Sequence, residues 1–105
     1  MSKKIKLISQ DNVLYDGEVS IIKDLYLFGN YVFDRTVKRL ISKEERKETI
    51  VDINNKRITI NNENTSLNFN ISINYYIENK DNIEFEYILE NECFKINLEV
   101  GDNDE

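Results

Sequence analysis

The sequence predicts an all-β protein, and three observations lead to that class. Apolar and polar residues alternate strictly over several short segments, which is typical of half-buried strands. Turn-forming residues recur at intervals of about 8–12 residues, as in small barrels and sandwiches. The 105 residues include no proline, and Ile, Val, Tyr and Phe, which favour strands, are abundant.

The strands are expected in chain order as follows. Early segments are KIKLI, GEVSI and the aromatic-rich LYLFGNYVF. TIVDI and KRITIN follow, and then SLNFNISINYYIEN, in which every second residue from Leu67 to Ile77 is apolar. The last two are NIEFEYILEN and CFKINLEV. Because the joints are short, we expect about eight strands in an antiparallel meander that closes into a small β-barrel or sandwich.

Two segments leave alternatives open. Residues 35–47 carry Val37, Leu40 and Ile41 at helical spacing, which slightly favours one short helix over a strand running into a charged loop. Asp16-Gly17 suits a hairpin turn, although Tyr15 to Val19 could instead be one bulged strand.

The length and the lack of a recognisable linker predict one β domain over residues 1–105, with an acidic tail, residues 101–105, that frays. The predicted core is Ile5, Leu7, Val19, Ile21, Val51, Ile53, Ile58, Ile60, Leu67, Phe69, Ile71, Ile73, Tyr75, Phe85, Tyr87, Leu89, Phe94, Ile96 and Leu98.

The residue content argues against several kinds of catalysis. The sequence has no histidine and one cysteine, so a Ser-His-Asp or Cys-His arrangement and a Cys/His zinc site cannot be built. Its three glycines are far apart, which excludes the phosphate-binding glycine motifs. Glu84 and Glu86 are expected to lie side by side on a wet strand face rather than across a cleft. We therefore expect no enzymatic activity, cofactor or metal.

Charge is distributed unevenly along the chain. The net charge is −6, and residues 81–105 hold nine acidic groups against Lys95 alone. Charged strand faces keep a sheet soluble, but an acidic face also selects basic partners. The candidate partner-binding residues are Glu84, Glu86, Glu90, Glu92 and Glu99.

A possible basic patch lies earlier in the chain and consists of Arg35, Lys38, Arg39, Lys43, Arg46 and Lys47. Because the whole chain is acidic, we expect this patch to be a solvated face that pairs with acidic groups. We do not expect it to bind nucleic acid directly.

Three features resemble a known family: the early DGE, the YVFDRT segment and the final IEFEYILENECFKINLEV hairpin. They are similar to the bacterial YwiB-like family of calycin-like β-barrels, whose function is unknown. The resemblance implies a β-barrel and brings no catalytic residues. In size, acidity and AT-rich codon bias the chain also looks like phage-encoded inhibitors of host defence nucleases, anti-CRISPR proteins among them.

We therefore expect a non-enzymatic protein that binds a basic macromolecule, such as a nucleic-acid-processing enzyme, and inhibits it. The alternative is a calycin-like barrel that holds a small apolar ligand. The single cysteine, with no signal peptide or apolar span, indicates the cytoplasm of a bacterium or phage-infected cell and no membrane contact. The oligomeric state is left open.

Overall fold

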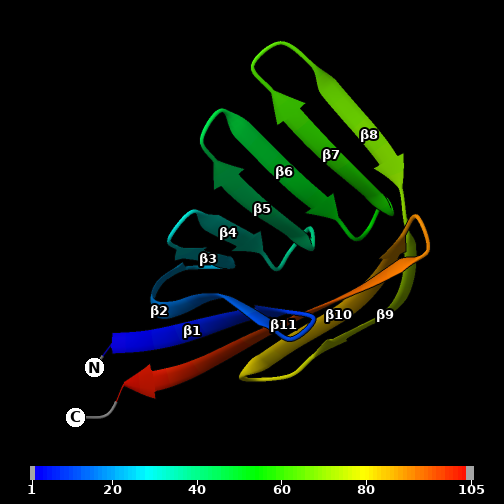
Figure 1. The fold of residues 1–105 in the computed structure, drawn as a ribbon. Helices are drawn as coiled ribbons and strands as arrows, with labels where there is room; N and C mark the ends of the chain where they lie inside the picture. The colour runs from blue at the N-terminus through cyan, green and yellow to red at the C-terminus, as the bar shows by residue number, and fades with distance from the viewer. Residues whose placement is uncertain (1, 104–105) are drawn as a thin grey trace. The chain divides into compact units, whose positions relative to one another are not determined.

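Every regular element that the structure describes is a β-strand (Figure 1). The structure is a computed structural model that describes residues 2–103; within that range it contains eleven strands and no helix. The strands are β1 (Ser2–Ser9), β2 (Asn12–Ile22), β3 (Leu25–Phe28), β4 (Tyr31–Asp34), β5 (Arg39–Glu44), β6 (Lys47–Asp52), β7 (Arg57–Asn62), β8 (Ser66–Asn70), β9 (Ser72–Glu78), β10 (Asn82–Leu89) and β11 (Glu92–Asn103). The all-β prediction is confirmed, but its count of about eight strands was too low.

The chain divides into two compact units, which we describe separately. Unit 1 contains the residues up to Ser20 and from Ser72 onward, and unit 2 contains Ile21–Ile71. Closure of the strands into a barrel or sandwich stays a prediction, because it concerns how the two units lie relative to one another.

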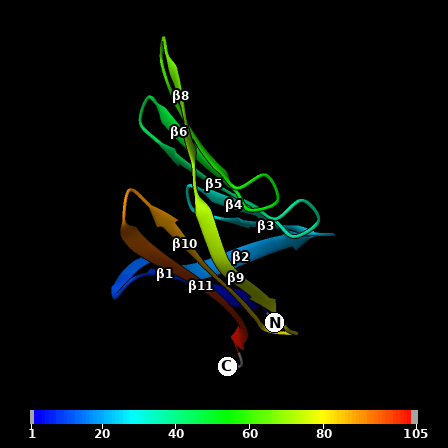
Figure 2. The same ribbon diagram turned by 90° about the vertical axis from the view of Figure 1, so that its right-hand side faces the viewer.

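Unit 1 joins strands from both ends of the chain (Figure 2). Its strand order is β2-β1-β11-β10-β9, with antiparallel pairing throughout. One face, the apolar face, carries the buried side chains of Ile5, Leu7, Ile83, Phe85, Tyr87, Ile96, Leu98 and Val100. The pairs Leu7–Leu98 and Phe85–Ile96 lie opposite each other in register, so the buried positions of neighbouring strands stack into one layer.

Unit 2 is a meander in which each strand pairs with the next, in the order β3-β4-β5-β6-β7-β8. Its buried residues include Tyr26, Phe28, Phe33, Leu40, Val51 and Ile58. Phe33 pairs with Tyr26 on one side and Leu40 on the other, so these side chains share one face of the sheet.

Residues in the left-handed conformation make many of the turns. Gly29 and Asn91, which tolerate positive φ, are two of them. The others are Gln10, Lys23, Lys38, Arg46, Lys56 and Glu90, with φ between 50° and 60°. Glu90 and Asn91 together form the two-residue connection of the β10–β11 hairpin, where positive φ matches the twist of the strands.

The helix expected over residues 35–47 is absent, which corrects that prediction. Residues 35–38 form turns, Arg39–Glu44 is β5, and Lys47 begins β6. Leu40 and Ile41 lie on opposite faces of β5, and Val37 is 38% exposed. Three apolar residues at helical spacing were too few, because pairing with both β4 and β6 over Arg39–Ser42 overrides local propensity.

The long strand expected at Ser66–Asn79 is two strands. β8 ends at Asn70 in unit 2 and β9 begins at Ser72 in unit 1. The Ile71 amide donates a 3.0 Å hydrogen bond to the Lys56 carbonyl, which continues the β7–β8 register by one residue before the chain enters β9. Apolar and polar residues continue to alternate across Ile71, so the sequence pattern does not indicate that one strand ends and another begins there.

Two residues of the predicted core are exposed. Leu67 is 51% exposed near the end of β8, and Ile21 is 39% exposed at the end of β2. The sequence also missed Tyr26, Phe28, Phe33 and Leu40, because the aromatic segment alternates over only four residues per strand and Leu40 was assigned to the helix.

Tyr15 to Val19 lies within one strand, so the second of the two alternatives for Asp16-Gly17 is correct. The bulge falls at Leu14, because Leu7 pairs with Tyr15 whereas Ile8 pairs with Val13. At the other end of the chain, β11 extends to Asn103, so the first three residues of the tail that we expected to fray are paired with β1. Residues 104–105 lie outside the described residues.

We expect Leu98→Ala to lower the free energy of unfolding by about 2–5 kcal/mol, because Leu98 is 0% exposed and its removal leaves a cavity. Leu67→Ala is the matched control: with its side chain half in solvent it should cost less than about 1 kcal/mol. Urea denaturation followed by circular dichroism measures both. Equal losses would contradict the burial pattern of β8.

Candidate functional site

The side of unit 1 opposite Phe85 and Leu98 carries most of its polar side chains, and we call it the polar face. Glu84 and Glu86 project from it on β10, and Glu99 projects from it on β11. Register places Lys6 beside Glu99, Asn97 beside Glu84 and Lys95 beside Glu86. Three of the five acidic residues predicted from sequence therefore share one face.

A β-bulge decides which residues of β9 join this face. Glu86 pairs with Tyr75, but the next residue, Tyr87, pairs with Ile73, so Asn74 is an extra residue in the strand. From Tyr75 onward, each side chain of β9 therefore lies on the face opposite to the one that uninterrupted alternation would give it. Tyr75 and Ile77 lie beside Glu86 and Glu84 on the polar face, whereas Tyr76 stacks on Phe85 with a centroid distance of 6.3 Å. The prediction that Tyr75 shares the core face with Ile73 was wrong.

Glu86 has the most contacts of the three carboxylates. Asn74 Nδ2 donates a 2.6 Å hydrogen bond to its Oε1, and Lys95 Nζ lies 3.9 Å from its Oε2. The bond from Asn74 lowers the pKa of Glu86, against partial desolvation, and Cys93 and Lys95 lower it further. Glu86 is therefore a fixed anion at neutral pH.

Glu84 contributes to a second local environment, which includes Tyr75 and Ile77. Desolvation, the charges of Glu84 and Glu86 and a hydrogen bond with Glu84 raise the pKa of Tyr75. Ile77, opposite Glu84, is 50% exposed. A tyrosine ring and an exposed isoleucine beside two carboxylates form a surface that is both apolar and acidic, and aromatic residues are enriched in protein interfaces.

Two asparagine side chains on the polar face have an amide oxygen that accepts no hydrogen bond from the described residues. Oδ1 of Asn82, beside Glu99, and Oδ1 of Asn97, beside Glu84, are buried, and the described residues give neither oxygen a hydrogen-bond partner. Buried acceptors without donors are uncommon in proteins. Because both oxygens are buried, they are not accessible to a binding partner.

The Glu99 end of the polar face has mixed charge. An open hollow of about 380 Å³ is lined there by Lys4, Lys6, Asp16, Asp81 and Glu99. In register, Lys6 lies between Asp16 and Glu99. The most acidic part of the face is therefore the β9–β10 side, where Lys95 is the only described cation in register with the two glutamates.

The other two predicted acidic residues lie elsewhere. Glu90 is in the β10–β11 turn, and Glu92 pairs with Leu89 on the side of β11 that carries Phe94 and Ile96. Strand parity could have shown this for Glu92, because an even-numbered residue of β11 cannot share a face with Glu99.

The predicted basic patch does not form one surface. Arg35 lies over the Tyr26 ring at 5.6 Å and donates a 2.8 Å hydrogen bond to its hydroxyl. Lys38 and Arg46 are turn residues with positive φ, and Lys43 and Lys47 lie on opposite faces of the β5–β6 hairpin. The six residues were grouped as a run of basic charge in the sequence, and the turns and strands place them on different surfaces.

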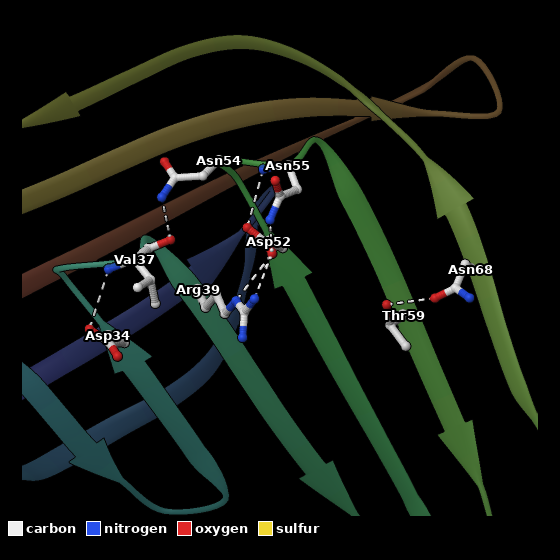
Figure 3. Close-up of polar contacts among 8 residues, drawn as sticks. All are labelled: Asp34, Val37, Arg39, Asp52, Asn54, Asn55, Thr59 and Asn68. Atoms are coloured by element: carbon white, nitrogen blue, oxygen red, sulfur yellow. Dashed lines mark hydrogen bonds and ion pairs between the residues drawn. The ribbon is translucent and has the colours of Figure 1, made fainter.

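Arg39 takes part in a structural network in unit 2, shown in Figure 3. Its Nε and Nη2 donate to Asp52 Oδ2 at 3.1 and 3.0 Å. Asn55 donates to the same carboxylate from its backbone amide and from Nδ2, at 3.2 and 2.8 Å. Burial raises the pKa of Asp52, but the bonds from Asn55 and the charge and bond of Arg39 outweigh it and hold the pKa below 3.8. These contacts fix the β6–β7 turn.

Cys93 is exposed on the polar face near Glu86. Desolvation and the hydrogen bond and charge of Glu86 raise the pKa of its thiol, which makes it a poor nucleophile. Within residues 2–103, no group of His, Cys, Asp and Glu could hold a metal ion, and no helix is long and apolar enough to cross a membrane.

No protein-family model, curated protein or solved structure matches the chain. The resemblances to the YwiB-like family and to anti-CRISPR proteins therefore stay predictions, and the geometry of the polar face carries the functional argument.

Asn74→Ala should raise the pKa of Glu86 toward its usual 4.5, because the variant removes the hydrogen bond that lowers it most. The carboxyl carbon shift of Glu86, followed by NMR against pH, measures this. Asn70→Ala on β8 is the matched control and should leave that titration unchanged. An unshifted Glu86 in the Asn74 variant would contradict the bulge geometry.

Asp52→Asn should lower the free energy of unfolding by about 1–3 kcal/mol at neutral pH, because it removes the charged acceptor that Arg39 and Asn55 share. The folded-state pKa of Asp52 is lowered, so its contribution is complete above 3.8 and is lost as the pH falls through the folded value. The gap between wild type and variant should therefore narrow in acid. Denaturant titrations at a series of pH values test this, and a gap that widened in acid would oppose it.

Proposed function

We propose that the protein binds a basic protein surface through the acidic side of the polar face and acts without catalysis. The observation that carries this proposal is the joint placement of Glu84 and Glu86 with Tyr75 and the exposed Ile77. Charge on such a face steers association, and the aromatic and aliphatic groups supply the apolar contact that holds the complex.

The partner class that we favour is a nucleic-acid-processing enzyme. Its binding groove is lined with lysine and arginine donors that normally meet phosphate oxygens. The carboxylates of Glu84 and Glu86, side by side on one strand face, offer acceptors to the same donors. Occupation of that groove would inhibit the enzyme by excluding its nucleic acid.

The contacts of Glu86 support a binding role because they fix the carboxylate in advance. Asn74 and Lys95 hold it from both neighbouring strands. Because the Glu86 side chain is already ordered, binding a partner cation costs less side-chain entropy than it would with a mobile glutamate. Lys95 is 54% exposed at its side chain, so it can turn aside when a stronger cation approaches.

Charge reversal at Glu84, Glu86 and Glu99 should abolish capture of basic proteins from a bacterial lysate. The bait is the whole chain, and bound proteins are identified by mass spectrometry. For an identified partner, the triple variant should associate more slowly and with a weaker dependence on salt than wild type.

Reversal of Glu90 and Glu92 is the matched control, because these residues lie off the polar face. That variant should retain the partner with a modest loss of association rate. Capture of the same proteins by wild type and by the triple variant would refute the proposal.

A further inference from the structure

A second polar surface lies in unit 2, on the side of the sheet opposite Phe33 and Leu40, and we call it the striped face. Cross-strand register arranges its side chains in three rows across β4 to β7. The first row contains Asp34, Arg39, Asp52 and Arg57, and the second contains Val32, Ile41, Ile50 and Thr59. The third contains Lys43, Glu48 and Asn61, one each on β5, β6 and β7.

The first row alternates in charge from strand to strand. Its order from β4 to β7 is negative, positive, negative, positive. Arg39 and Asp52, at the centre, already form an ion pair within the chain. Asp34 and Arg57, at the two ends, are three strands apart, which is about 14 Å at the usual strand spacing, so they cannot pair with each other in one chain.

Such an order is complementary to its own reverse. Consider a second copy related by a two-fold axis that lies between the two faces, parallel to the strands and over the gap between β5 and β6. The striped faces of the two copies then pack against each other with their strand orders reversed, and each row faces the same row. Asp34 then meets Arg57 of that copy, and Arg39 meets its Asp52. In the third row, Lys43 meets Glu48 of the second copy. Every charged position of the three rows faces its opposite.

The apolar row obeys the same operation. Ile41 faces Ile50 of the second copy, and Val32 faces the methyl-bearing Thr59. Ile41, Ile50 and Val32 are half-buried, so they still have surface to cover, whereas Arg39, Arg57 and Lys43 are exposed at the border. An apolar centre with charged flanks is the usual anatomy of an interface.

From this complementarity we propose that the striped face is the interface of a symmetric homodimer. The three rows carry three acidic and three basic groups, so two copies meet without net repulsion. Two copies of the polar face of unit 1 would repel each other, because that face carries more carboxylates than lysines. The carboxylates are those of Asp16, Glu18, Glu84, Glu86 and Glu99, and the lysines are Lys4, Lys6 and Lys95. The proposal is independent of the proposed function and uses a different surface.

The size of the face sets the expected strength. Four strands at a spacing of about 4.8 Å and three rows at about 6.8 Å cover roughly 400 Å². Two such faces bury about 800 Å² in total, which is below the size of a stable interface and fits a weak, transient one. A dimer that dissociates on dilution is therefore expected.

Sedimentation equilibrium of the whole chain over a range of concentrations should show a reversible monomer–dimer equilibrium. Arg57→Glu and Asp34→Lys should each raise the dissociation constant roughly ten- to hundredfold, because each creates two symmetric like-charge contacts. Glu18→Lys and Lys4→Glu, on the polar face of unit 1, are the charge-matched controls and should leave the constant unchanged.

Mixing the two variants gives the decisive result. In a heterodimer of R57E with D34K, both end contacts join opposite charges again, so the mixture should dimerise when neither variant does so alone. Asp34 also accepts a 3.0 Å hydrogen bond from the Thr36 amide, so the K43E and E48K pair provides a second mixture that leaves this turn intact. Circular dichroism confirms that each variant is folded.

A wild-type chain that stays monomeric at every concentration would overturn the proposal. So would mixtures that remain monomeric, or control variants that weaken the dimer as much as the reversals on the striped face.

Discussion

A β-strand sends successive side chains to opposite faces, and this protein depends on where that alternation is kept and where it is broken. A shift of one residue exchanges every side chain beyond it between the two faces. The extra residue at Asn74 makes such a shift in β9 and brings Tyr75 and Ile77 to Glu86 and Glu84. Without the bulge, those two side chains would lie on the face of Phe85 and the acidic surface would consist of glutamates alone.

Alternation made much of the fold accessible from the sequence. The strands around Phe85 and Leu98 were correctly expected to bury these residues, because each runs for several residues without interruption. Alternation could not locate the break at Ile71, since the break is a change of partner strand, from β7 before it to β10 after it, and the apolar spacing continues through it. It also misassigned Leu40, whose burial depends on its cross-strand partners Phe33 and Val51 rather than on its neighbours in sequence.

The candidate site was accessible only in part for a related reason. Glu84 and Glu86 are two residues apart on one strand, so their common face follows from local geometry. Glu99 joins them through the register of β11 against β10, which the sequence does not encode locally. The basic residues at 35–47 were grouped by their closeness in the sequence, and the strands distribute them among turns and both faces of a hairpin.

The turns have a consequence for engineering. Gln10, Lys23, Lys38, Arg46, Lys56 and Glu90 hold the left-handed conformation without being glycine or asparagine, at a cost of about 1 kcal/mol each. Replacing these residues with ones that tolerate positive φ should therefore increase the free energy of unfolding. Glycine or asparagine at these positions should give a more stable scaffold, which would tolerate destabilising substitutions on its strand faces.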